Sequence, residues 1–310
     1  MKRPATPGRT GRTGRPSAHR RYLDAYTERS RAADLEERVT RAWPPRSVLE
    51  LDGWRLRLGG GLPLPASSAW PRADGGRVPL DVRLAGTARF YRDAGVPPCI
   101  QIGPAAQPAG LDAALAERGW RREHVHELRT GALAGLTAPR PPAPLGGGED
   151  GSAAAQATAV RAAAAQVHAE TTDSGGVAER WLAAWAQRTG RDAAARATAA
   201  TVLQRVPAAS CWALAGPEQA PTGVARGVLD GGWLGIADLD ADDALTAAAL
   251  LARLLAWAEP GHAEQVWWLV PQQASGVRDL ARRVGLRRTF TLHHRVLAPG
   301  TTGAASAGGA

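Results

Sequence analysis

Cysteine is scarce in this chain of 310 residues: Cys99 and Cys211 are the only two, far apart and without metal-ligand spacing. So few cysteines exclude a disulfide scaffold and fit a reducing compartment. No apolar run approaches the ~20 residues that a membrane-spanning helix needs. Residues 1–21 also lack the apolar core of a secretory signal. We therefore expect a cytoplasmic location and no membrane partner.

Lysine is almost absent, with Lys2 as the single example, and the basic charge is unevenly distributed. Of the net charge of +9, seven units lie in residues 1–21, which contain no acid. The rest of the chain is close to neutral, so its charge does not indicate nucleic-acid binding. We expect residues 1–30 to form a disordered basic tail. Only this tail could contact nucleic acid, and a Gly/Pro/Arg-rich tail is more often simply solvated.

A complete metal-binding pattern is also missing. His124 and His126 share a strand face, but no third ligand accompanies them. His293 and His294 are adjacent on a predicted strand, so their side chains face opposite ways. We expect no metal site.

Hydrophobic residues make up 44% of the chain, enough for a sizeable core. Their periodicity and the turn residues between them predict an alternation of helices and strands. Helices are predicted at 22–42, 80–94, 108–118, 153–170, 177–187, 191–206 and 274–284. Strands are predicted at 48–58 (a pair or one bulged strand), 98–102, 121–129, 211–215, 265–270 and 287–296.

The chain divides into two similar halves. Each ends with a helix, a glycine suited to left-handed backbone (Gly119 and Gly285) and a strand, a pattern that suggests internal duplication. We expect an N-terminal half over 31–130, a Pro/Gly linker over 131–151, a C-terminal domain over 152–298 and a disordered tail over 299–310.

Residues 223–258 organise the C-terminal half and read as strand, tight turn, strand and long helix. Asp230-Gly231-Gly232 is a hairpin signal, because glycine adopts positive φ without a steric penalty. In the second strand Leu234, Ile236 and Asp238 alternate with the residues between them, as a strand requires. Apolar residues up to Ala258 then recur at helical spacing and predict the long helix. A strand that feeds a helix N-terminus in this way is a possible anion or cofactor site.

The element order of the C-terminal half resembles the GNAT acyltransferase superfamily. The stretches that carry the likeness are GVLDGGWLGIADL, LLARLLAWA and DLARRVGLRRTFTLHHRV. The N-terminal half resembles the truncated GNAT-like half of tandem members through AWPPRSVLELDGWRLRLGGG and RFYRDAGVPPCIQIGPAAQPAGLDAALAERGWRRE. The implied fold is α/β (α+β), with two tandem GNAT-like halves and a mixed central sheet flanked by helices.

The resemblance implies transfer of an acetyl group from acetyl-CoA to an amine. The pantetheine amides would bond to the backbone of the second hairpin strand, and the pyrophosphate would lie at the N-terminus of the following helix. The resemblance places Asp238 at a position that can face the acceptor amine, as a candidate catalytic residue; the alternative is a carboxylate bonded to neighbouring backbone. Glu170, predicted at the end of a helix, is the other candidate catalytic residue, in part of the acceptor wall; the alternative is an ordinary polar helix end. The resemblance places the cofactor contacts at Leu239, Asp240, Ala241, Ala244, Leu245, Thr246, Ala247 and Ala274.

Two departures from the family pattern concern this site. The pyrophosphate turn should carry arginine or glutamine and glycines, but residues 240–247 contain three aspartates and neither arginine nor glycine. Acids at a helix N-terminus also have an ordinary structural role, since they cap the helix and complement its dipole. The tyrosine expected to protonate the leaving thiolate is replaced by Ala281.

Two hypotheses follow. The first is an acetyl-CoA-dependent N-acetyltransferase that acts on a small-molecule or protein amine. The alternative is a catalytically degenerate GNAT-fold module that serves as a binding or regulatory protein. The sequence specifies neither the acceptor nor the oligomeric state.

Overall fold

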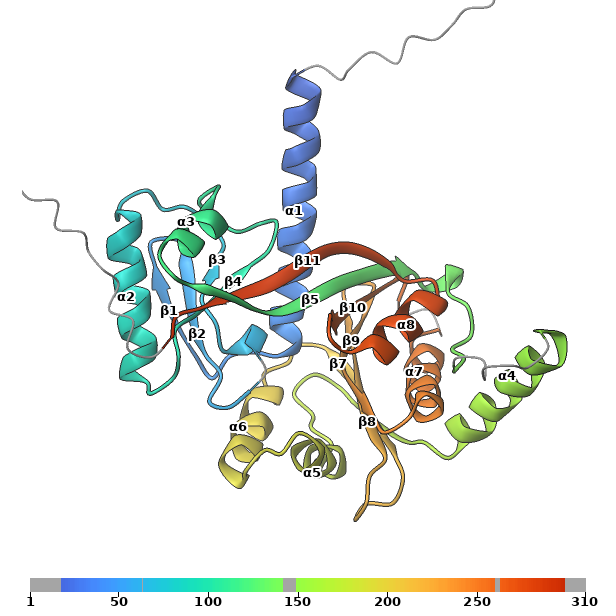
Figure 1. The fold of residues 1–310 in the computed structure, drawn as a ribbon. Coiled ribbons are helices and arrows are strands. Elements are labelled where there is room, and N and C mark those ends of the chain that lie inside the picture. Colours follow the sequence, from blue (N-terminus) through green and yellow to red (C-terminus); the bar gives the residue numbers. More distant parts are fainter. Residues whose placement is uncertain (1–17, 63, 142–148, 260–262, 299–310) are drawn as a thin grey trace, which may run out of the picture.

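The computed structural model describes residues 18–62, 64–141, 149–259 and 263–298 (Figure 1). The helices are α1 (Ala18–Ala42), α2 (Leu80–Asp93), α3 (Leu111–Glu117), α4 (Glu149–Ala165), α5 (Glu179–Arg188), α6 (Ala193–Leu203), α7 (Ala244–Ala258) and α8 (Ser275–Arg283), with 3-10 turns at Leu64–Ala66 and Leu133–Gly135. The strands are β1 (Ser47–Leu51), β2 (Trp54–Leu58), β3 (Trp70–Pro71), β4 (Cys99–Ile102), β5 (Arg121–Ala132), β6 (His168–Thr172), β7 (Ala209–Ala215), β8 (Gly223–Asp230), β9 (Trp233–Ala241), β10 (Gln265–Pro271) and β11 (Arg287–Val296).

Eight strands form one mixed sheet in the order β4-β11-β5-β10-β9-β8-β7-β6. Strand β5 comes from the N-terminal half, yet it lies between β10 and β11 of the C-terminal half and is antiparallel to both. The long strands β5 and β11 run side by side across the molecule and join its two parts (Figure 1). The predicted mixed central sheet is therefore confirmed, and it is shared by the two halves.

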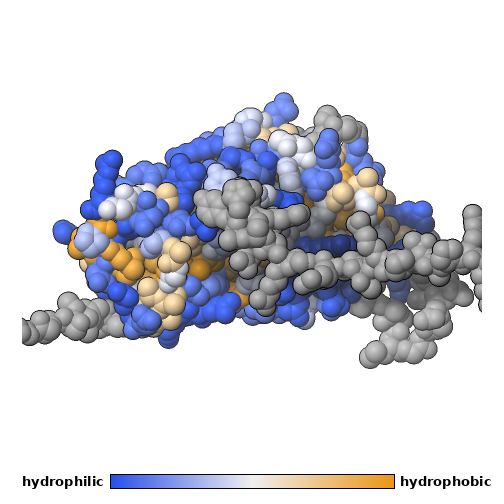
Figure 2. All heavy atoms as spheres, turned by 90° about the horizontal axis from the view of Figure 1, so that it is seen from above, coloured by the Kyte–Doolittle hydropathy of each residue, from blue (hydrophilic) through white to orange (hydrophobic). Residues whose placement is uncertain are grey.

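Helices cover both faces of this sheet. On one face α7 and α8 pack over an apolar cluster that includes Leu234, Ile236, Leu254 and Trp268. On the other face α1, α5 and α6 pack over a second cluster, rich in tryptophan and including Trp43, Trp181, Trp185 and Trp212. A third cluster lies under α2 and α3, beside the small sheet β1-β2-β3. Hydrophilic residues predominate on the face seen from above in Figure 2, with small hydrophobic patches between them.

Most predicted elements are confirmed, and three predicted boundaries are corrected. The helix predicted over 153–170 ends earlier, because α4 stops at Ala165 and residues 168–172 form the edge strand β6. The tail predicted over 1–30 is helical in its last part, where α1 begins at Ala18; residues 1–17 lie outside the described part of the chain. Within the predicted linker, β5 extends to Ala132 and α4 begins at Glu149, while residues 142–148 lie outside the described part.

The glycine predictions are confirmed where a turn depends on them. Gly231 and Gly232 have φ of 54° and 78° in the β8–β9 turn. Gly119 and Gly285 have φ of 77° and 100° after α3 and α8. A Cβ is strained at positive φ, so these four positions favour glycine. Among the described residues, no helix is long and apolar enough to cross a membrane.

Candidate functional site

Strands β9 and β10 separate along their length. Their parallel pairing runs only from Trp233 and Gln265 to Ile236 and Trp268. Beyond that point β9 continues to Ala241 and β10 to Pro271, where β10 pairs with β5 alone. The β9 backbone at residues 237–241 therefore has an edge that is not paired with β10, and this separation of the two strands is called the opening below. An extended chain of amides can pair with such an edge as an added strand.

A β-bulge lies at the start of this opening. Arg226 of β8 pairs with Asp238 of β9, while the next β8 residue, Gly227, pairs with Ile236. Ala237 is therefore an extra residue on β9, and a bulge of this kind re-aims the side chains that follow it. The predicted alternation, which puts Leu234, Ile236 and Asp238 on one face of the strand, is wrong. Leu234 and Ile236 lie on the face covered by α7, whereas Asp238 contacts Trp43 on the opposite face.

Asp238 is largely buried and makes polar contacts with Trp43 of the α1 region and with Arg226 of β8. Its Oδ2 atom accepts hydrogen bonds from Trp43 Nε1 at 3.0 Å and from Arg226 Nε at 3.3 Å. Its side chain is 16% exposed. Burial raises the pKa of Asp238 to about 6, although the Arg226 charge and both hydrogen bonds act in the opposite direction. Among the described residues no partner contacts Oδ1, which leaves that oxygen able to accept a proton or a ligand hydrogen bond.

Arg226 is the partner that the sequence reasoning missed. Its side chain is fully buried, with the guanidinium 4.7 Å from the Trp43 ring centroid and 5.4 Å from that of Trp212. Nη2 donates to the Ala42 carbonyl at 2.7 Å, while Nη1 has no partner within the described chain. Burial lowers the pKa of Arg226, and the Asp238 charge raises it. The signal in the sequence is a single arginine in an otherwise apolar strand, GVARGV.

Glu170 and Asp238 lie in one row across the sheet but far apart. Glu170 of β6 pairs with Trp212, Trp212 with Arg226, and Arg226 with Asp238. Three strand spacings separate the two acids, roughly 14 Å. Glu170 is exposed on the edge strand, so the predicted position at a helix end is wrong. The two carboxylates cannot act on the same atom in this arrangement.

The N-terminus of α7 is occupied by the chain's own carboxylate. Asp243 accepts a hydrogen bond at Oδ1 from the Thr246 backbone N–H, and at Oδ2 from the Thr246 hydroxyl, each at 2.8 Å. These bonds lower the pKa of Asp243, with the backbone bond as the largest cause. Asp243 therefore caps the helix, which is the ordinary structural role of an acid at this position. The Thr246 N–H, which a bound phosphate could use, already donates to Asp243.

The other two aspartates of the turn are clamped by an arginine. Arg188 of α5 contacts Asp240 Oδ2 at 2.6 Å through Nε and Asp242 Oδ1 at 2.9 Å through Nη2. Its side chain is 11% exposed, and Nη1 donates to the Pro221 carbonyl at 2.8 Å. The turn thus carries three carboxylates against one guanidinium, which gives it a net negative charge.

The remaining predicted cofactor contacts surround this turn. Leu239 and Ala241 lie on the open part of β9, and Ala244 and Leu245 are exposed in the first turn of α7. Ala247 is buried against the sheet, while Ala274 is the N-cap of α8. The strand edge fits the amide chain of acetyl-CoA, whereas the capped and acidic helix start does not fit its pyrophosphate. Ala281 is fully buried in α8, and its methyl side chain has no proton to donate to a leaving thiolate.

The histidines are closer together than the sequence indicated. His294 is fully buried, and its ring lies 6.3 Å from that of His124 and 6.2 Å from that of His126. His293 faces the other way and contacts Asp112 at 2.8 Å. Even with this third histidine, the described residues contain no group of three side chains arranged to hold a metal ion.

Two solved structures are similar over most of the chain. A GCN5-related N-acetyltransferase from Kribbella flavida matches with a TM-score of 0.54 and 17% identity, over 87% of this chain and 96% of that one. A tandem GNAT protein from the clavulanic acid biosynthesis pathway matches with a TM-score of 0.51 and 13% identity, over 90% and 94% of the two chains. No protein-family profile and no curated protein matches the sequence. At these identities the likeness concerns the fold, and it agrees with the shared sheet, the separated strands β9 and β10 and the following helix α7. The chain has the fold of these two GNAT proteins.

Proposed function

We propose that this protein is a GNAT-type acyltransferase that takes an acetyl group from acetyl-CoA and transfers it to the amine of a small molecule or a protein. The observation that carries the proposal is the opening between β9 and β10, which begins beside the bulge at Ala237. Acetyl-CoA would supply the activated acyl group. The chain would supply the backbone edge of residues 237–241, which suits an amide-bearing arm.

Asp238 is the proposed proton acceptor. Its Oδ1 atom has no partner within the described chain, and Oδ2 is held by Trp43 and Arg226, which fixes the carboxylate in place. A pKa of about 6 leaves most of the carboxylate ionised at neutral pH while keeping it basic enough to take a proton. Glu170, roughly 14 Å away along the same face, would contact only a distant part of a large acceptor.

A second function is favoured by the start of α7. The Asp243 cap and the Arg188 clamp replace the free amides and positive charge that a pyrophosphate needs. On this evidence the alternative is a GNAT-fold module that no longer binds acetyl-CoA and acts by binding a partner. The two functions differ in one measurable property, the affinity for the acyl donor.

Calorimetric titration with acetyl-CoA and with S-acetylpantetheine, which lacks the pyrophosphate, separates them. The acyltransferase proposal expects saturable binding of both, with acetyl-CoA no tighter than S-acetylpantetheine, because the acidic turn repels the additional charge. Asp242→Asn should tighten acetyl-CoA alone by about fivefold, since removing one unit charge a few ångströms away changes the energy by about 1 kcal/mol. Asp93→Asn, an exposed acid on α2, is the matched control.

A turnover assay then tests the base. Release of the CoA thiol is followed with a panel of primary amines, with the wild type and Asp238→Asn in parallel. An acyltransferase loses turnover in Asp238→Asn and keeps its donor affinity. If neither donor binds up to millimolar concentration, the acetyltransferase proposal is wrong and the module remains.

A further inference from the structure

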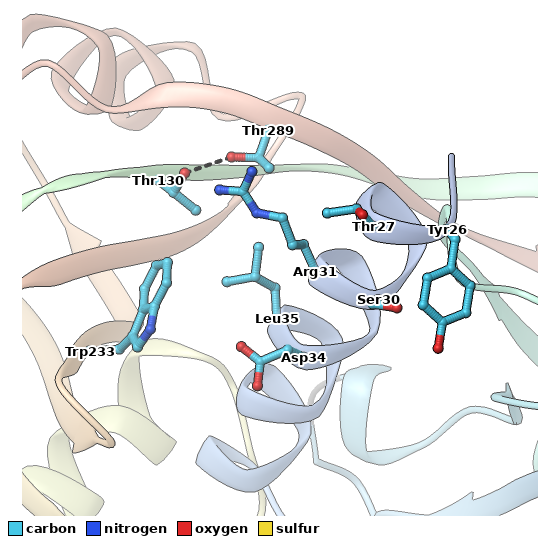
Figure 3. Close-up of a pocket in the computed structure, with 9 residues that line it drawn as sticks. All are labelled: Tyr26, Thr27, Ser30, Arg31, Asp34, Leu35, Thr130, Trp233 and Thr289. Atoms are coloured by element: carbon cyan, nitrogen blue, oxygen red, sulfur yellow. Dashed lines mark hydrogen bonds between the residues drawn. The ribbon is translucent and has the colours of Figure 1, made fainter. Parts of the chain in front are cut away.

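A cavity at the junction of the two halves is separate from the opening beside Asp238. It has a volume of about 380 Å³ and lies between α1 and the strands β5, β9 and β11 (Figure 3). Helix α1 contributes Tyr26, Thr27, Ser30, Arg31, Asp34 and Leu35, and the strands contribute Thr130, Trp233 and Thr289. Its volume falls within the range of small-molecule sites, roughly 300–1,000 Å³.

The charges around this cavity are unbalanced. Asp34 is neutralised by Arg38, whose Nε lies 3.0 Å from Asp34 Oδ2. Arg31 is exposed and has no ion-pair partner among the described residues; it extends from α1 toward Thr130 and Thr289 (Figure 3). Arg287 pairs directly across from Thr130 on β11 and is also without an ion-pair partner within the described chain. The side of the cavity near Arg31 and Arg287 is therefore positively charged, and within the described chain no carboxylate is paired with either arginine.

Two hydroxyls lie at the positive side of the cavity. Thr289 Oγ1 and Thr130 Oγ1 are 2.7 Å apart. The β11–β5 register shifts between Arg288 and Phe290, so Thr289 is an extra residue in a bulge. Because a bulge re-aims its side chain, it accounts for the presence of the Thr289 hydroxyl in the cavity. An anion held by Arg31 could accept a further hydrogen bond from this pair.

Leu35 and Trp233 form an apolar part of the lining, next to Arg31 (Figure 3). Leu35 is buried, and the Trp233 indole is half-buried at the start of β9. The guanidinium of Arg38 lies 5.4 Å from the Trp233 ring centroid and donates through Nη1 to the Asp230 carbonyl, which holds the indole in place. A ring can pack on this wall while an attached anionic group reaches Arg31.

We infer that this cavity is a binding site for a small organic anion, a carboxylate attached to a planar ring. The guanidinium of Arg31 binds the carboxylate, one hydroxyl of the Thr130–Thr289 pair donates to it, and Trp233 and Leu35 pack against the ring. Because α1 and β5 belong to one half and β9 and β11 to the other, the ligand contacts both halves. The site lies at the start of β9, at the opposite end of that strand from residues 237–241.

The test compares 2-naphthoate with the uncharged 2-naphthamide, which has the same ring, by calorimetric titration of the full chain. Saturable binding of 2-naphthoate is expected, about tenfold tighter than that of 2-naphthamide, because a charge-assisted hydrogen bond contributes about 1.5 kcal/mol or more. Arg31→Gln should abolish this preference while leaving 2-naphthamide binding unchanged. Arg89→Gln, an exposed arginine on α2, is the matched control and should keep it.

Trp233→Ala should weaken both ligands, and inorganic phosphate should bind more weakly than 2-naphthoate because it cannot use the apolar wall. The inference is overturned if 2-naphthoate binds no tighter than 2-naphthamide, or if the preference survives Arg31→Gln. Phosphate binding as tight as that of 2-naphthoate would equally overturn the assignment of a ring-bearing ligand. Saturating acetyl-CoA should not displace 2-naphthoate, so failure of either site leaves the other testable.

Discussion

The buried ion pair between Arg226 and Asp238 gives a prediction whose size and pH dependence follow from the structure. Replacing Arg226 by methionine keeps an unbranched apolar side chain between Trp43 and Trp212 but removes the charge that faces Asp238. Removing one member of a buried pair costs about 3–5 kcal/mol of the free energy of unfolding. We expect a loss of this order at neutral pH.

The pH dependence identifies the cause. In the wild type the pKa of Asp238 is about 6 in the folded protein against 3.8 for an ordinary aspartate, which corresponds to about 3 kcal/mol. Folding favours the protonated carboxyl, so this contribution to stability is fully present below pH 4 and is lost as the pH rises to 6. Without Arg226 the pKa rises further, and the loss continues above pH 6. From pH 6 to 7.5 the difference between wild type and variant should grow by up to about 2 kcal/mol.

Urea unfolding followed by tryptophan fluorescence at pH 5, 6 and 7.5 measures this difference. The double variant Arg226→Met/Asp238→Asn is the control, and it should show a smaller loss with no growth above pH 6, because no titrating group remains. If Arg226→Met loses the same free energy of unfolding at all three pH values, the reasoning about the buried carboxylate is refuted.

Two further predictions concern single contacts. Asp243→Ala removes the cap of α7 and should lower the free energy of unfolding by about 1 kcal/mol at pH 7. Because the pKa of Asp243 is lowered on folding, the wild-type advantage should shrink as the pH falls below 4 in urea titrations; an advantage that does not change with pH would contradict this. Tyr91→Phe removes a buried hydroxyl that accepts from the Arg57 N–H and donates to the Arg57 carbonyl, both at 3.1 Å. It should cost about 1–3 kcal/mol in thermal unfolding, and Tyr26→Phe, at an exposed tyrosine, should cost almost nothing.

The sequence predicted the elements well because hydrophobic period and turn chemistry are local signals. The hairpin at Gly231–Gly232 and the helix after Asp243 are examples, since each depends on residues within a few positions of one another. The boundary between α4 and β6 was missed because an alanine-rich run continues the helical pattern up to His168. There the choice of strand comes from pairing with β7, which is distant in sequence.

The candidate site was less predictable for the same physical reason. Asp238 could be selected from its strand, but the bulge at Ala237 that changes its face has no local sequence signature. Its partners, Trp43 and Arg226, are 195 and 12 residues away in the chain. The Arg188 clamp on Asp240 and Asp242 likewise joins elements that are 52 and 54 residues apart. A single sequence carries no information about which distant residues meet.

The position of β5 between β10 and β11 has a consequence for the synthesis of the protein. When the ribosome has made residues 1–141, the segments of β4 and β5 have been synthesised, but their shared neighbour β11 is the last strand among the described residues. The pairings of β4 and β5 with β11 cannot form before residues 287–296 have emerged. A chain that lacks residues 287–296 would leave the twelve-residue strand β5 with one unpaired edge and the short strand β4 without a partner in the sheet. Unpaired strand edges are sites of aggregation. Strand β11 is thus the element through which β4 and β5 become part of one sheet.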